Sequence, residues 1–596
     1  MVKFLLPAFI PGLAIIFWPA FGLTASDVEP SKLAAGARRP VALVLDEHRH
    51  LLHVANRRGT ISTIDVRSGR VVSESNVGKQ LAWLEPIGGA SIGRLLAVDE
   101  ASHQLLVLRV DATDSEGDRT GEDLIAVERR VAVSRYPVRV AVDEGRRVAY
   151  VASLWSRRVA AFSLDTWHML WQRDLEFAPR VLLPLSSRGR LLVADAFADR
   201  IGVADAATGE LIRTVRIPGH AFRGLTLNHD GSRVVLAQKL LNELARTDQD
   251  DIHWGLLMSN DLRWLKLDQL LAGSPDLLKE SFIHPLGEPS RAAADPEAVL
   301  MTRDGNVVVA IGGVGEIEYG REQDYILRRL RVGRRPTALA SDAAGRTIYI
   351  ADTFDDTIVV VDLRAETVVA RWPLGPHRDR TLMERGERAF YDGRLSLNGW
   401  MSCHSCHVDG HTNSRLNDNL SDGSFESSKR VLSLLGRSGT SPFAWNGKQP
   451  SLEGQVRASL KKTMRSPHTI DDETVRAMTA YIESLPPPPP LDVARDTVDA
   501  KLVAQGRRVF DRRGCAECHE PETYTSPDVY DVGLTDEKGN RRFNPPSLRG
   551  VSQRDRWLHD GRASTLRDVF AKTKHGLEEP ISAAELEALL AFLRQL

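Results

Sequence analysis

The chain has 596 residues, a length that predicts about three to five domains, each large enough to bury a core. Its 78 Lys and Arg and 79 Asp and Glu residues give a formal net charge of −1, so no basic excess indicates nucleic acid or anionic lipid as a partner. Hydrophobic residues make up 42% and charged residues 26% of the chain, a globular rather than a disordered composition. All four cysteines lie in two short strings near the C-terminus, which leaves none for structural disulfides.

The N-terminus has the pattern of an export signal. Lys3 precedes an almost wholly apolar run over residues 4–23, and small residues around Ala25 follow before the chain turns polar. This pattern predicts a secretory signal peptide over residues 1–25. The run nearly reaches the length of about 20 apolar residues that an uncleaved membrane anchor needs, but its three prolines favour cleavage. We therefore expect an exported bacterial protein, periplasmic or on the cell surface, with no membrane span after removal of the signal.

A β-strand pattern recurs over residues 36 to 375. Each copy has an opening proline or turn, then three short apolar runs separated by polar turns, the third with an acidic residue. A repeat of about 40–45 residues is typical of a four-stranded propeller blade. The pattern predicts an all-β propeller of about seven blades over residues 26–377, and its copies resemble YVTN-type propeller repeats. The clear and degenerate copies begin near Pro40, Trp83, Pro137, Pro179, His220, Pro296 and Pro336.

Residues 239–285 depart from this pattern. The spacing of their apolar residues favours helices, for example over Lys239–Leu244. We expect a helix-leaning insertion on one face of the propeller, where it can meet a neighbouring domain or a partner.

The cysteines form two strings, Cys403-His404-Ser405-Cys406-His407 and Cys515-Ala516-Glu517-Cys518-His519. Both have the spacing of c-type haem attachment, in which two thiols on one helical face reach one porphyrin and the following histidine ligates the iron. A thioredoxin-like redox pair would need a βαβ context, and a zinc site would need two cysteine pairs at one metal. The sequence predicts two covalently bound haem c groups, with His407 and His519 as iron ligands and Cys403, Cys406, Cys515 and Cys518 as attachment residues.

The two strings lie in related units. At an offset of 114 residues, 433–437 aligns with 547–551 and 445–448 aligns with 559–562. An amphipathic helix leads into each string and another ends each unit, while a proline run between the units acts as a stiff spacer. We predict two all-α cytochrome c-type domains, over residues 378–490 and 491–596.

The segment from about 380 to 596 resembles the bacterial di-haem cytochrome c peroxidase family, which includes the MauG-like enzymes. The resemblance rests on the paired strings, on Phe443–Gly447, and on Phe543–Val551 followed by Leu558–Arg562. It implies that one haem reacts with hydrogen peroxide while the other supplies electrons or shares oxidising equivalents. By position, Trp445 would be the relay between the haems, and Gln455 would lie in the peroxide pocket. The family often has calcium between its haem domains, so calcium is a further candidate cofactor.

The ligands on the other side of each iron depart from the family pattern. The family ligand of the second haem follows a Thr-Leu string and is often Met, but no Met follows Met478 in this chain. His575 is the nearest competent ligand, with a solvated surface histidine as the alternative. In the first unit Met464 and His468 occupy a comparable stretch, and for each of them ligation and a surface role are both open. We expect His411 to be a polar surface residue.

The acidic residue that the family uses beside the peroxide would fall near Arg465, which is not acidic. Glu453 or a propeller residue could substitute for it. The prediction is therefore a peroxidase-like oxidoreductase, in which peroxide binds the iron of His407 and a small redox protein donates electrons. The alternative is a pure electron-transfer cytochrome with six-coordinate irons and the propeller as a docking platform, which the missing acid favours.

Overall fold

A computed structural model describes residues 37–88, 92–111, 124–420 and 423–596. The predicted signal peptide over residues 1–25 lies outside this range. Within the described residues, none of the helices combines the length and apolarity needed to cross a membrane.

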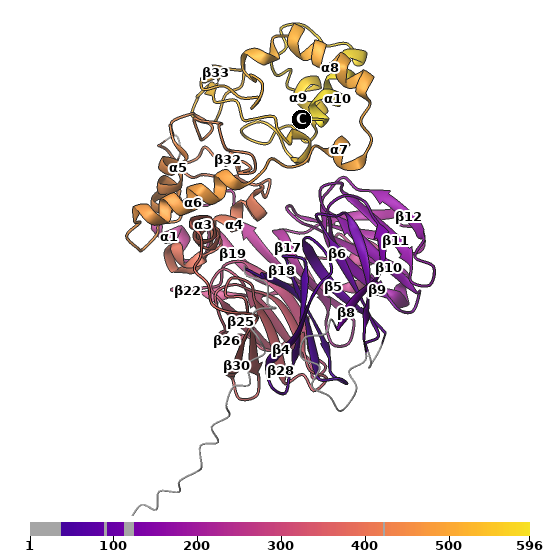
Figure 1. The fold of residues 1–596 in the computed structure, drawn as a ribbon. Coiled ribbons are helices and arrows are strands. Elements are labelled where there is room, and N and C mark those ends of the chain that lie inside the picture. The colour runs from indigo at the N-terminus through magenta and orange to yellow at the C-terminus, as the bar shows by residue number, and fades with distance from the viewer. Residues whose placement is uncertain (1–36, 89–91, 112–123, 421–422) are drawn as a thin grey trace, which may run out of the picture.

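The N-terminal part is a propeller of seven four-stranded antiparallel sheets, which confirms the predicted architecture and blade number (Figure 1). Each sheet uses four strands that are consecutive in the chain. The first three blades are β1 (Pro40–Asp46), β2 (Leu51–Asn56), β3 (Thr60–Asp65), β4 (Arg70–Asn76); β5 (Leu81–Ile87), β6 (Arg94–Asp99), β7 (Gln104–Val110), β8 (Ile125–Ala132); β9 (Pro137–Asp143), β10 (Val148–Ser153), β11 (Arg158–Ser163) and β12 (Met169–Asp174).

The remaining four blades follow the same order. They are β13 (Pro179–Leu185), β14 (Arg190–Asp195), β15 (Arg200–Asp205), β16 (Leu211–Arg216); β17 (His220–Leu227), β18 (Arg233–Leu241), β19 (Met258–Lys266), β20 (Phe282–Pro285); β23 (Pro296–Met301), β24 (Asn306–Ile311), β25 (Glu316–Arg321), β26 (Arg328–Arg331); β27 (Pro336–Ser341), β28 (Thr347–Asp352), β29 (Thr357–Asp362) and β30 (Thr367–Pro373). A small hairpin, β21 (Gly287–Glu288) and β22 (Arg291–Ala292), precedes the sixth blade.

Side-chain packing closes the ring between the first and the last blade. Leu52 and Ile64 of the first blade share one buried cluster with Ala351 and Ile358 of the last. Because each blade completes its own sheet, burial of apolar surface between neighbouring blades holds the ring together.

The prediction of a helix-leaning insertion over 239–285 is wrong. Residues 239–241 are the end of β18, which pairs over its whole length with β19. Only α1 (Gln249–His253) and α2 (Leu267–Ala272) are helical there. Both faces of β18 are buried, so its sequence lacks the alternation of polar and apolar residues that identifies a half-buried strand.

Two helical units follow the propeller. The first contains α3 (Leu382–Phe390), α4 (Cys403–Cys406), α5 (Leu452–Ala458) and α6 (Asp472–Ser484); the second contains α7 (Leu491–Arg495), α8 (Ala500–Arg512), α9 (Leu566–Ala571) and α10 (Ala583–Arg594). Each also has a two-stranded sheet, β31 (Leu416–Asn417) with β32 (Lys429–Arg430), and β33 (Tyr530–Asp531) with β34 (Arg542–Phe543). The units are therefore mainly helical rather than all-α, because two-residue strands are too short to leave an alternating pattern in the sequence.

Both units are built around the same helix crossing. A Cβ at Gly386 of α3 would lie 1.8 Å from the Ala477 carbonyl oxygen of α6, and one at Gly506 of α8 would lie 1.9 Å from the Ala588 carbonyl oxygen of α10. Only glycine allows the two backbones to approach so closely. This shared crossing extends the internal repeat from the sequence to the tertiary structure.

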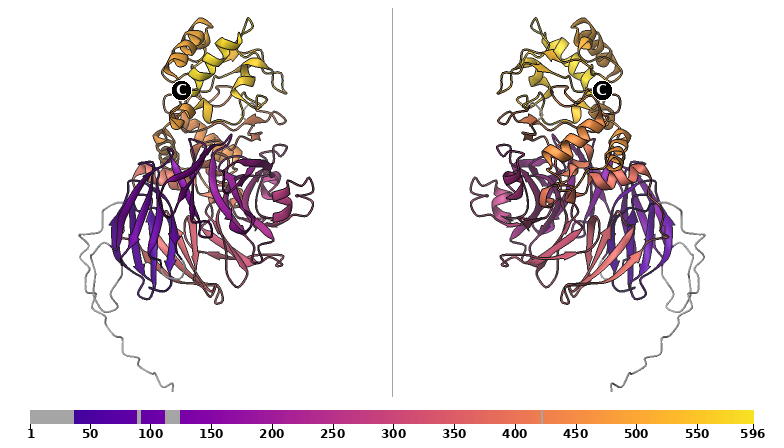
Figure 2. Two further views of the ribbon diagram at one scale, coloured as in Figure 1. Left: turned by 90° about the vertical axis from the view of Figure 1, so that its right-hand side faces the viewer. Right: turned by 90° about the vertical axis from the view of Figure 1, so that its left-hand side faces the viewer.

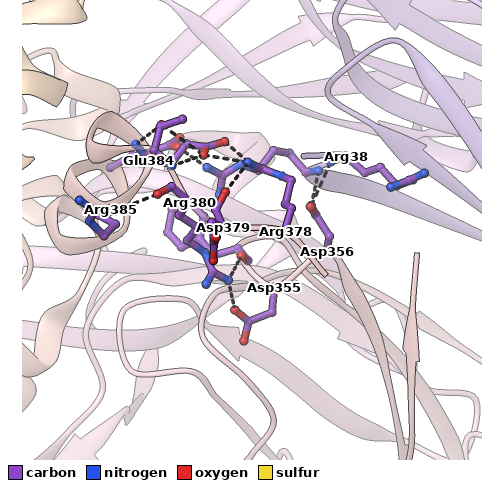
Figure 3. A network of polar contacts seen from close by, with 12 residues as sticks. Arg38, Asp355, Asp356, Arg378, Asp379, Arg380, Glu384 and Arg385 are labelled. Atoms are coloured by element: carbon purple, nitrogen blue, oxygen red, sulfur yellow. Dashed lines mark hydrogen bonds and ion pairs between the residues drawn. The ribbon is translucent and has the colours of Figure 1, made fainter. Parts of the chain in front are cut away.

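The connection between the propeller and α3 is held on the last blade. The Arg380 guanidinium donates to the Asp355 carboxylate at 2.7 Å and to the Phe354 carbonyl at 3.0 Å. Arg378 reaches Glu384 of α3 at 2.9 Å, and the backbone nitrogen of Arg38 donates to the neighbouring Asp356 (Figure 3). The start of the propeller, its last blade and the first helix are thus joined at one place.

Both helical units lie on the same side of the propeller (Figure 2). The second unit contacts it through Asp555, which pairs with Arg200 at 2.7 Å, and through Gln553, whose amide oxygen accepts from Arg157 at 3.2 Å. Arg157 lies in the turn between the second and third strands of its blade, and Arg200 begins the third strand of the next blade, so both lie at the same edge of the propeller.

The close crossing predicts a large effect of one methyl group. Gly386→Ala should lower the free energy of unfolding by about 1–3 kcal/mol, because the added Cβ forces α3 away from α6. Thermal unfolding of the full chain measures this loss. Gly93→Ala is the control, since a Cβ there meets no atom within 4 Å. Equal melting temperatures for the two variants would contradict the crossing.

Candidate redox site

The first attachment string lies on the wall of a cavity that we call the first cavity. Cys403, Cys406 and His407 line it, and it encloses about 1320 Å³ of empty space, mouth included. The His407 Nδ1 donates to the Leu432 carbonyl at 2.8 Å, which leaves Nε2 with its lone pair. Burial lowers the pKa of His407 to about 4, so its imidazole is neutral at neutral pH. A neutral imidazole held through its other nitrogen is the usual form of a histidine metal ligand.

The second string repeats this arrangement in a second cavity of about 1160 Å³, also lined by its two cysteines and its histidine. The His519 Nδ1 donates to the Tyr524 carbonyl at 3.1 Å, and burial lowers the pKa of His519 to about 4. Both predicted proximal histidines therefore present one free nitrogen to an apolar cavity that contains two thiols.

The candidate distal ligands lie in these cavities. His575 lines the second cavity together with His519, and its Nδ1 is buried without a hydrogen-bond partner. Met464 lines the first cavity and is 4% exposed, with its sulfur 4.0 Å from the Cys403 sulfur. His468 is exposed and does not line the first cavity, so the structure separates these two candidates of the first unit.

Trp445 forms part of the wall between the cavities. It lines both of them, is 8% exposed, and donates from its indole nitrogen to the Arg430 carbonyl at 2.8 Å. Arg430, Asn544 and Pro546 also line both cavities. Groups bound in the two cavities would therefore have an indole ring between them.

The first cavity contains the predicted glutamine but not an acid. Gln455 lines it, and the side-chain oxygen assigned to Gln455 is buried without a partner. Glu453, named above as a possible substitute acid, is exposed and lies outside the lining. Among the described residues that line the first cavity, none is Asp or Glu.

The expectation that His411 is a surface residue is wrong, because it is 1% exposed. Its Nε2 donates to the Gln553 carbonyl at 3.1 Å, and its ring packs edge-on against Trp155 and Phe197 of the propeller. The local sequence is polar, but segments far away in the chain bury it.

Three arginines between the cavities were not singled out from the sequence. Arg430 and Arg437 line the first cavity, and Arg430 and Arg554 line the second. Burial lowers the pKa of Arg430 to about 9 and of Arg437 to about 10, and burial with repulsion from those two holds the pKa of Arg554 well below its usual range. No carboxylate of the described residues pairs with them. One arginine among many carries no sequence signal, so only the fold reveals the cluster.

The charge of this cluster and the other lining residues indicate whether the cavities suit haem. Buried cations that only carbonyl groups contact are costly unless an anionic group joins them, and a haem carries two propionate carboxylates. The donor set of each cavity also fits: two thiols, a fixed neutral histidine and mainly apolar walls. The residues present therefore suit a haem group in each cavity.

His559 is a further cavity residue that the sequence placed only within a family string. Its ring stacks on Phe543 with centroids 4.2 Å apart, and it lies 6.4 Å from the Trp445 ring. Its Nε2 is buried without a partner.

For calcium, the described part of the chain contains no group of three or more His, Cys, Asp or Glu side chains arranged to hold a metal ion.

Comparisons with known proteins agree with this geometry. Residues 380–486 match the family model of di-haem cytochrome c peroxidase. Methylamine utilization protein MauG of Methylorubrum extorquens is 26% identical over 297 residues, covering 38% of this chain and 79% of that protein. Cytochrome c551 peroxidase of Nitrosomonas europaea is 23% identical over 289 residues, covering 39% of this chain and 86% of that protein.

Among solved structures, hydrazine synthase of Kuenenia stuttgartiensis aligns with a TM-score of 0.47 and 13% identity, covering 56% of this chain and 99% of that chain. The sequence relatives support a haem-dependent, peroxidase-like oxidoreductase. The C-terminal region of this chain thus matches the di-haem cytochrome c peroxidase family model and is similar to MauG, and a seven-bladed β-propeller precedes it.

Proposed function

We propose that the protein is an exported cytochrome with two covalently attached haem c groups that reduces hydrogen peroxide, or uses it to oxidise a substrate. The observation that carries the proposal is the position of Trp445, which lines both cavities. Reduction of one hydrogen peroxide to two water molecules consumes two electrons and two protons. Two redox groups on either side of one indole suit a reaction that needs two electrons at one site.

The residues around the cavities have distinct roles in this proposal. When bound, haem supplies one-electron redox chemistry and an iron centre. Cys403, Cys406 and His407 would hold one group, and Cys515, Cys518 and His519 the other. The unpaired side-chain oxygen of Gln455 would accept from peroxide and orient it in the first cavity, and Trp445 would relay electrons between the cavities.

Export to the periplasm or the cell surface is the second part of the proposal. The apolar run over 4–23 and the small residues after it support export. A small redox protein would serve as the electron donor. The net charge of −1 gives no reason to invoke nucleic acid.

A pure electron carrier is the second candidate, and two observations favour it. A general acid that protonates the departing oxygen typically accelerates such a cleavage by about 10²–10⁴-fold, yet none of the described residues lining the first cavity is a carboxylate. Met464 also lies in that cavity, where it is available as a second ligand. Peroxide would then have no open iron.

Spectroscopy of the purified full-length protein distinguishes the two candidates. The proposed function predicts a high-spin ferric signal from one iron in the as-isolated or half-reduced protein, and a change in that signal when hydrogen peroxide is added. Two low-spin species that ignore peroxide would establish the electron carrier instead.

Trp445→Phe tests the relay. Peroxide-driven turnover should fall by roughly tenfold or more, while both haems stay attached, because phenylalanine keeps the packing but is far harder to oxidise. Trp171→Phe is the matched control, since Trp171 has the same 8% exposure but lies in the third blade. Undiminished turnover in Trp445→Phe would remove Trp445 from the path.

His575→Ala tests ligation in the second cavity. The variant should lose the low-spin signature of one haem and keep the other unchanged, and added imidazole should restore it by entering the space left by the side chain. His468→Ala, at an exposed site, should leave both spectra as they are. Retention of both low-spin signatures in His575→Ala would show that another group is the ligand.

A further inference from the structure

The two attachment strings have different surroundings. Between the cysteines of the first string, His404 and Ser405 are 0% exposed because they are packed against the propeller. Between those of the second, Glu517 is exposed. The same motif therefore occurs once inside an interface and once facing solvent.

One carboxylate of the propeller holds the first string. Asp295, in the residue position before β23, accepts hydrogen bonds from the hydroxyls of Ser402 at 2.5 Å and of Ser405 at 2.8 Å. These serines precede the first and the second cysteine of the string. The Lys239 ammonium lies 2.8 Å from the same carboxylate, and both charged side chains are 0% exposed. Burial raises the pKa of Asp295, but Lys239 and His404 outweigh it and keep that pKa below its usual value.

Lys239 is a basic residue at a position that is acidic in three of the other six blades. There the residue opposite the start of the first strand is acidic: Asp99 faces Leu81, Asp195 faces Pro179 and Asp352 faces Pro336. The remaining three blades have Asn56, Ser153 and Ile311 at this position. In the fifth blade Lys239 faces His220 at this position.

The acidic residues at this position serve their own blades. The Asp352 carboxylate, for example, accepts from the backbone nitrogens of Arg334 and Arg335 at 3.0 and 2.8 Å. A lysine ammonium has no acceptor for such bonds, so Lys239 cannot play this role in the fifth blade. Lys239 instead pairs with Asp295, the carboxylate that reaches the haem attachment string.

A second contact fixes the other end of the string. Asp409, two residues after His407, accepts from Arg223 at 2.7 Å and from Arg180 at 3.3 Å, on neighbouring blades. His220 also bonds the Ser405 carbonyl at 2.9 Å. The string is therefore held at both ends, and the Lys239–Asp295 pair sits next to its cysteines.

We propose that the charges of the buried Lys239–Asp295 pair in the propeller tune the reduction potential of the first haem but not that of the second. The proposal rests on the proposed function, since it requires a haem on Cys403 and Cys406. A charge buried away from water acts strongly on a nearby redox centre. Asp295 favours the ferric state and Lys239 favours the ferrous state, so the balance between the two charges contributes to the potential.

The pair predicts opposite shifts for its two members. Asp295→Asn leaves the ammonium unbalanced and should raise the midpoint potential of the first haem, whereas Lys239→Met leaves the carboxylate unbalanced and should lower it. We expect each change to alter the ferric–ferrous equilibrium about tenfold, which is about 59 mV for a one-electron couple. The double variant should fall between them.

The measurement is a spectroelectrochemical titration of both haems in the full-length holoprotein. Asp352→Asn is the matched control, because Asp352 is a buried carboxylate at the repeat position of another blade and accepts from backbone groups of its own blade region. It should leave both potentials unchanged. The second haem is an internal reference and should keep its potential in every variant.

A subtler substitution keeps the test decisive if a buried charge variant fails to fold. Ser402→Ala removes one hydrogen bond that neutralises Asp295 and should lower the potential of the first haem, while Ser402→Thr keeps the hydroxyl and should match the wild type. Two attached haems with unchanged potentials in the folded variants would overturn this inference and leave the proposed function standing. Wild-type protein without haem would overturn the proposed function itself.

Discussion

The wall between the two cavities is formed by hydrogen bonds between the two helical units. The backbone nitrogen of Arg430 donates to the His559 carbonyl at 2.7 Å, and that of Asn544 donates to the Trp445 carbonyl at 2.8 Å. The first bond joins β32 to the loop before α9, and the second joins the loop of Trp445 to the residue that follows β34. Because they fix backbone to backbone, they hold the indole of Trp445 in register with both cavities at once. Every redox role assigned to the pair of units depends on this contact.

The same wall concentrates positive charge in an apolar setting. Arg430, Arg437 and Arg554 lie close enough to lower one another's pKa, and burial without a carboxylate partner would be costly for a redox unit that stayed empty. The cluster is therefore best understood as a binding feature rather than a stabilising one. Haem groups would complete the interior of these units, where side chains leave a cavity.

The propeller affects the two units unequally. It buries the first attachment string through Asp295 and through Arg223, which pairs with Asp409 of that unit. The second unit rests on the propeller residues Arg200 and Arg157, away from its own string. Two units with the same helix crossing and the same motif thus acquire different environments from a third domain. Such inequality is what a pair of redox centres needs if one is to react and the other to supply electrons.

Short-range sequence patterns determined much of the fold and of the candidate site. The spacing of the cysteines and histidines, the 40-residue β-repeat and the 114-residue offset between the units are properties of short segments, so the propeller and both attachment strings could be recognised without coordinates. The sequence failed where burial comes from remote residues. The segment 239–285 has helix-like apolar spacing at its start because residues 239–241 end β18, a strand buried on both faces, and the polar neighbours of His411 favour a surface position that the fold does not give it. The arginine cluster, the shared position of Trp445 and the Lys239–Asp295 contact joined residues tens to hundreds of positions apart, and only the tertiary structure, which decides which side chains lose water together, brought them into one site.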